Sequence, residues 1–101
     1  MFRGTTPKLT FNVEFDVSYI DTLWITFKQG SKIKFEKQFE DCLINTEKNQ
    51  IIVNLTQAET LSLIANLDLN IQLRVGFSNG KRAASKLITT YVDDILHDGE
   101  I

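Results

Sequence analysis

Hydrophobic and polar residues alternate along most of the chain, which is the period of β-strands that bury one face. The longest run alternates from Leu67 to Phe77 without a break. Shorter runs of the same kind occupy residues 9–15, 23–27, 33–36 and 51–55. The apolar positions of these runs predict the inward-facing core: Phe11, Val13, Ile25, Phe27, Phe35, Val53, Ile71, Leu73 and Val75.

Gly30 lies between two alternating runs and predicts the first hairpin. A loop with an odd number of residues is needed to keep apolar residues opposite one another. We therefore expect a three-residue loop over residues 29–31. This loop would set Phe27 opposite Ile33 and Ile25 opposite Phe35.

Asn79 and Gly80 predict a second hairpin. The dipeptide favours a two-residue turn, but that turn would pair Val75 with Ala84. A three-residue loop over residues 78–80, with Gly80 in the left-handed conformation, keeps the apolar partners together. The expected pairs are then Val75 with Ala83 and Ile71 with Leu87.

One segment has helical rather than alternating spacing. Thr56 and Glu59 fit a capping box, in which each side chain accepts a hydrogen bond from the backbone N–H of the other residue. The pattern predicts a helix over residues 57–65, with Leu61, Ile64 and Ala65 on its buried face. A tight helical turn is also expected over residues 16–21.

About seven short strands separated by turns predict an immunoglobulin-like antiparallel β-sandwich with one short helix. A small, partly open β-barrel has the same sequence pattern. No repeat or linker divides the chain, so residues 1–101 are expected to form one domain. Residues 1–6 precede the first strand and residues 93–101 follow the last. We interpret these segments as N-terminal and C-terminal arms that bind neighbouring subunits; the alternative is that both fold back over the open ends of their own sandwich.

Composition narrows the classes of partner. A chain of 101 residues with 43% hydrophobic residues can bury a core without metal or disulfide support. The formal net charge of −2 lacks the positive bias that a phosphate backbone requires, so nucleic acid is not expected as a partner. Neither a signal peptide nor a membrane span is expected.

Few residues could support catalysis or bind a metal. Cys42 and His97 are the only cysteine and histidine, and Cys42 begins an apolar run that predicts a core position. The carboxylates of Asp93, Asp94 and Asp98 surround His97, but their spacing matches neither an EF-hand nor a zinc site. We expect no enzyme activity, no cofactor, no metal and no small-molecule substrate.

Several residues are candidates for contacts with other proteins. Trp24 lies at an outward position of its strand, where it either covers the second face of the sheet or anchors an interface. We expect the lysines on and beyond the first hairpin to protect a strand edge from unwanted pairing rather than to attract an acidic partner. The arms carry apolar groups that an isolated domain would leave exposed, and Arg3 could add a charge-assisted contact. The partner-binding candidates are Phe2, Arg3, Trp24, Ile95, Leu96 and Ile101.

The two ends of the chain resemble a group of short proteins encoded by phages and prophages of Firmicutes. The resemblance rests on Met1-Phe2-Arg3-Gly4-Thr5-Thr6-Pro7, on Leu9-Thr10-Phe11 and on Ile95-Leu96-His97-Asp98-Gly99-Glu100-Ile101. The strand pattern is also similar, more loosely, to the N-terminal immunoglobulin-like domain of phage baseplate upper proteins. The long fibre-forming C-terminal region of those proteins has no counterpart among these 101 residues.

The resemblance implies a structural component of a phage virion, made in the cytoplasm of the bacterial host. Its partners would be further copies of itself, as a homo-oligomer, or other capsid, neck or tail proteins. The alternative is a small phage-encoded binding module for a host factor or a cell-surface glycan, centred on Trp24.

Overall fold

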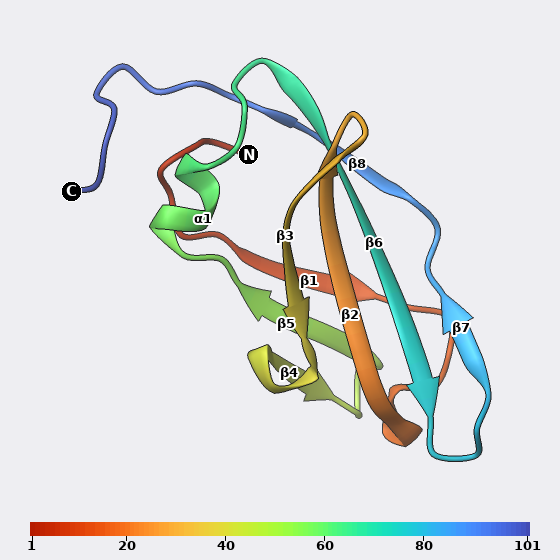
Figure 1. Cartoon of the computed structure of the whole chain (residues 1–101). Helices are drawn as coiled ribbons and strands as arrows, with labels where there is room; N and C mark the ends of the chain where they lie inside the picture. Colours follow the sequence, from red (N-terminus) through yellow and green to blue (C-terminus); the bar gives the residue numbers. More distant parts are fainter.

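The computed structural model describes residues 1–101 and shows two antiparallel β-sheets stacked on each other, with one short helix at an end (Figure 1). The strands are β1 (Lys8–Asn12), β2 (Ile20–Gln29), β3 (Lys32–Gln38), β4 (Cys42–Asn45), β5 (Gln50–Asn54), β6 (Leu67–Phe77), β7 (Arg82–Ala84) and β8 (Ile88–Val92). The helix is α1 (Gln57–Leu61), and two 3-10 turns, η1 (Val17–Tyr19) and η2 (Phe39–Asp41), precede β2 and β4.

The strand order confirms the expected sandwich. One sheet has the order β1-β5-β4, and the other has the order β3-β2-β6-β7, with β8 also paired to β6. These orders match B-E-D and C′-C-F-G of the immunoglobulin fold, with β7 and β8 sharing the position of G. The strands form two separate open sheets, which is consistent with a sandwich and not with the alternative of a small, partly open β-barrel. No strand occupies the position of A, which in that fold lies beside B.

The core lies between the sheets, and its centre is the pairing of β2 with β6. Ile25 faces Leu73 and Phe27 faces Ile71 across this pair, and all four side chains are buried. Of the predicted core, Phe11, Val53 and Val75 are also buried, whereas Val13 and Phe35 are half-buried and pack against it. The alternation therefore identified the inward faces. Further buried residues lie outside the predicted set: Val17, Ile20, Leu23, Ile51, Leu55, Leu63, Leu69 and Val92.

The predicted register of the first hairpin is wrong. The loop has two residues, Gly30 and Ser31, because Gln29 pairs with Lys32 at the end of the ladder. The register then shifts between Phe27 and Lys28, which leaves Lys34 unpaired in a bulge.

The bulge sets Phe27 opposite Phe35 instead of Ile33, and Ile25 opposite Lys37 instead of Phe35. The Phe27 and Phe35 rings stack with their centroids 4.5 Å apart. The bulge therefore keeps an apolar residue opposite Phe27, a result that the sequence pattern had attributed to a three-residue loop.

The second hairpin agrees with its prediction near the turn. Gly80 has a φ of 88°, and Val75 pairs with Ala83 across a three-residue loop. Farther along, Ile71 pairs with Ile88 rather than with Leu87. The pairing shifts because the Ser85 hydroxyl, in place of a backbone carbonyl, accepts a hydrogen bond from the Leu73 N–H at 3.0 Å. Because the side-chain oxygen takes the place of the backbone acceptor, β7 ends here and is separated from β8.

The helix begins as predicted and ends early. Thr56 and Glu59 form both hydrogen bonds of the capping box, but α1 stops at Leu61 instead of residue 65. Leu63 is buried beyond the helix, whereas Ile64, assigned to the buried face, is exposed. The expected turn before β2 is confirmed by η1. No helix is long and apolar enough to cross a membrane.

The buried centre of β2 and β6 gives a direct stability test. Phe27→Ala should lower the free energy of unfolding by about 3–5 kcal/mol, because it leaves a cavity between the sheets. Thr22→Ala, at an exposed position of the same strand, should cost about 1 kcal/mol or less. Chemical denaturation of both variants measures the difference. Equal losses would contradict the assignment of the buried face.

Candidate protein-binding surfaces

The N-terminal arm lies against the segment that follows β8. Phe2 and Asp93 form an isolated parallel bridge. The Arg3 N–H donates to the Asp93 carbonyl at 3.0 Å, and the Asp93 N–H donates to the Met1 carbonyl at 2.7 Å. The two ends of the chain are therefore joined by backbone hydrogen bonds at one end of the sandwich.

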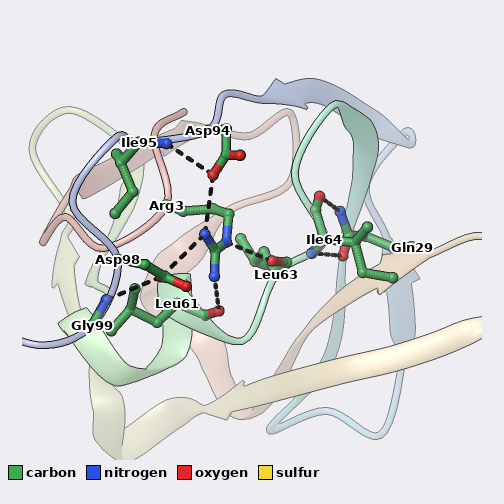
Figure 2. Close-up of polar contacts among 9 residues, drawn as sticks. All are labelled: Arg3, Gln29, Leu61, Leu63, Ile64, Asp94, Ile95, Asp98 and Gly99. Carbon is green, nitrogen blue, oxygen red and sulfur yellow. Dashed lines mark hydrogen bonds and ion pairs between the residues drawn. The ribbon is translucent and has the colours of Figure 1, made fainter.

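Arg3 ties both arms to the segment after α1 (Figure 2). Its Nε donates to the Leu63 carbonyl at 2.9 Å, and its Nη2 donates to the Leu61 carbonyl at 3.0 Å. Its Nη1 lies 3.1 Å from Asp94 and 3.4 Å from Asp98. These contacts explain why the helix ends at Leu61: the guanidinium, and not the amides of a further helical turn, binds the carbonyls that follow.

A second side chain fixes the same segment. Gln29 is buried, and its Nε2 donates to the Ile64 carbonyl at 2.9 Å while its Oε1 accepts from the Ile64 N–H at 2.8 Å. Figure 2 shows this pair beside the Arg3 contacts. Residues 61–64 therefore obtain from two side chains the hydrogen bonds that a longer helix would have supplied.

Asp94 is held by the same cluster. The backbone N–H of Ile95 donates to its carboxylate, and the Arg3 guanidinium donates to the same oxygen. These hydrogen bonds, the one from Ile95 first, lower the pKa of Asp94 below its usual value. Asp94 therefore stays ionised through the physiological pH range, where its charge balances that of Arg3.

The C-terminal arm begins by packing onto the N-terminal one. A Cβ atom on Gly4 would lie 2.8 Å from Ile95 Cδ1, and Gly4 also has a φ of 70°, so only glycine fits this contact. Ile95 is accordingly half-buried. Arg3 and Ile95, two of the candidates for partner contacts, thus make contacts within the chain.

The other arm candidates remain at the surface. Phe2 is 56% exposed, and Leu96 and Ile101 are almost completely exposed. Asp94 and Asp98, on either side of His97, both face the Arg3 guanidinium. The structure contains no group of three or more His, Cys, Asp or Glu side chains arranged as metal ligands. The arms are thus tied to the domain through Arg3, Asp94, Ile95 and Asp98, while the side chains of Phe2, Leu96 and Ile101 remain exposed.

Trp24 lies on the outer face of the five-stranded sheet and is 39% exposed. Its cross-strand neighbour is Arg74, and the Arg82 guanidinium lies over the nearby Gly76, where a Cβ would be 3.2 Å from it. Neither arginine is in an ion pair. An exposed indole beside guanidinium groups that have no acidic partner can contact anionic or aromatic groups of a partner.

A third surface was not identified from the sequence. A groove of about 540 Å³ runs beside the outer edge of β1, between the two sheets. Its apolar walls come from Leu9, Phe11, Val13, Ile71, Leu73 and Ile88, together with Met1 and Phe2 of the N-terminal arm. The groove lies where strand A of an immunoglobulin domain would cover the edge. It could not be identified from the sequence, because its walls come from strands that are far apart in the chain.

The single cysteine has no feature of a reactive thiol. Cys42 is half-buried against the core, and burial, followed by the nearby Asp41 charge, raises its pKa to about 11. The thiol therefore stays protonated at neutral pH and is a poor nucleophile. This position agrees with the interpretation of Cys42 as a small packing residue.

Comparison with known proteins found no matching family model, no matching curated protein and no matching solved structure.

The Arg3 cluster generates a stability prediction. Arg3→Ala should lower the free energy of unfolding by about 1–3 kcal/mol, because it leaves the Leu61 and Leu63 carbonyls without their charged donor. Arg82→Ala is the matched control, since the Arg82 side chain donates only to the neighbouring Lys81 carbonyl. Thermal and chemical denaturation should show little change for this control. A loss of the same size in both variants would contradict a special role for Arg3.

Proposed function

We propose that this chain is a non-enzymatic structural protein of a phage virion, which assembles through contacts with itself or with capsid, neck or tail proteins. The observation that carries the proposal is apolar surface that the fold leaves uncovered: the groove beside β1 and the side chains of Leu96 and Ile101. Such surface is typical of sites that another protein covers. The resemblance of both chain ends to phage and prophage proteins supports the same role.

The contacts that tie the arms to the domain explain how exposed residues can be presented in a defined place. Arg3 holds Asp94 and Asp98, so the chain on either side of Leu96 is tied to the domain. Leu96 itself is directed away from it. Burying a leucine or isoleucine side chain against a neighbour contributes about 1.5–3 kcal/mol. Two such contacts per copy, repeated around an assembly, would give substantial binding energy.

A second candidate function is recognition of a host factor or a cell-surface glycan. The observation that favours it is the exposed Trp24 ring beside Arg74 and Arg82, neither of which has an acidic partner in the chain. An aromatic ring supplies a flat surface for a sugar, and guanidinium groups bind carboxylates or phosphates in pairs of hydrogen bonds. In this alternative the protein would act on the host and be absent from mature particles.

Particle composition separates the two functions. A double substitution, Leu96→Ser with Ile101→Ser, keeps Asp98 on Arg3 and removes only exposed apolar groups. We expect the purified variant to melt like the wild type, because neither side chain packs on the domain, and to enter particles at a reduced copy number. Quantitative mass spectrometry of purified particles measures that number.

Leu87→Ser is the control, since Leu87 is also exposed but lies away from the arms, between β7 and β8. It should leave the copy number unchanged. Wild-type protein at a fixed number of copies per particle is the expected result. Its absence from particles would contradict the structural role and favour recognition through Trp24.

A further inference from the structure

The two open sheets expose four strand edges, and three of them carry features that prevent pairing with another chain. The edge at β3 has Lys32, Lys34 and Lys37 and a bulge at Lys34. The edge at β7 and β8 is interrupted at Ser85. The edge at β4 has only four residues and follows a 3-10 turn. Lysines, bulges and short strands are the means by which proteins protect sheet edges.

The fourth edge, β1, has the fewest of these features along the strand itself. It is a regular strand of five residues with one lysine and no bulge. The Leu55 N–H donates to the Pro7 carbonyl, so in the alternating antiparallel ladder the backbone groups of Leu9 and Phe11 also face β5. The N–H and C=O groups of Lys8, Thr10 and Asn12 therefore point away from β5, toward the open side. No hydrogen bond within the chain uses them.

The space beside this edge suits an added strand. The apolar groove of about 540 Å³ follows β1 along its length, and its floor includes Phe11, Ile71 and Leu73. A strand placed there would form main-chain hydrogen bonds with β1 while its own inward side chains contacted the groove. Addition of a strand to an exposed edge is a known mode of protein recognition.

We infer that the occupant of this edge is β1 of a second copy, paired antiparallel about a two-fold axis at Thr10. This register sets Thr10 opposite Thr10 of the other copy and Lys8 opposite its Asn12. All three outward-pointing positions of each strand are then used, with six backbone hydrogen bonds across the pair expected from the ladder geometry. The two three-stranded sheets become one continuous sheet with β1 and its copy at the centre.

The charges and side chains of β1 favour this self-pairing. Lysine meets asparagine, so no like charges face each other, and the threonine pair can form a cross-strand contact. Leu9 of one copy lies opposite Phe11 of the other, which brings the apolar walls of the two grooves together. A two-fold interface is isologous, so the same short sequence serves both sides and the assembly closes as a dimer.

This inference rests on the proposed function, because it names one contact through which copies assemble, but its test is independent of particles. Sedimentation equilibrium of the full chain should show a concentration-dependent monomer–dimer equilibrium. Thr10→Lys and Thr10→Glu should each weaken the dimer about tenfold or more, because like charges then meet at the axis. An equimolar mixture of the two variants should restore dimer formation, because opposite charges now meet.

Two further variants make the result specific. Thr10→Pro removes the central N–H donor without touching the β1–β5 ladder, and should abolish the dimer while the monomer stays folded. Thr22→Lys, an exposed threonine of the other sheet, should leave the equilibrium unchanged. A wild-type chain that stays monomeric at high concentration would overturn the pairing, as would failure of the mixture to recover. Particle composition would still decide the proposed function separately.

Discussion

The antiparallel pairing of β2 with β6 is the interaction on which the remainder of the sandwich depends. These two strands are the longest, and their inward residues, among them Ile25, Phe27, Ile71 and Leu73, form the buried floor against which the three-stranded sheet packs. The other strands of the larger sheet attach to one side of this pair or the other. Because β7 and β8 both pair with β6, the break between them at Ser85 does not interrupt the sheet.

The smaller sheet, which packs on this central pair, lacks the strand that flanks B in an immunoglobulin domain. The smaller sheet covers the floor with three strands, and no fourth strand flanks β1. The N-terminal arm, which could have supplied that strand, instead crosses to Asp93 and is held there by Arg3. The same contacts that tie the two ends of the chain together therefore leave the β1 edge and its groove open to a partner.

Sequence periodicity predicted the sandwich and most of its inward faces, because alternation of apolar residues reports burial directly. It failed where a side chain replaces a backbone hydrogen bond. Arg3 donates to the Leu61 and Leu63 carbonyls and Gln29 to the Ile64 carbonyl, which ends the helix early. Ser85 shifts the second hairpin. The bulge at Lys34 was missed because a three-residue turn and a two-residue turn with a bulge both set an apolar residue opposite Phe27, which is Ile33 in the first case and Phe35 in the second.

The candidate surfaces were predictable to different extents. Exposure of Phe2, Leu96 and Ile101 follows from apolar residues lying outside the alternating runs, whereas the roles of Arg3 and Ile95 within the chain depend on contacts between its two ends. The open edge of β1 could not be predicted, since it depends on which strands become neighbours in the folded sheet. Its identification therefore rests on strand order and register together.

In the proposed dimer, a second copy pairs with the β1 edge that the fold of a single chain leaves open. Amide hydrogen exchange along β1 tests this pairing most directly, by comparing the dilute monomer with the assembled state. Leu9 and Phe11 should be protected in both, because they bond to β5, whereas Lys8, Thr10 and Asn12 should exchange rapidly in the monomer and become protected on assembly. Rapid exchange of these three amides in the assembled state would contradict the account.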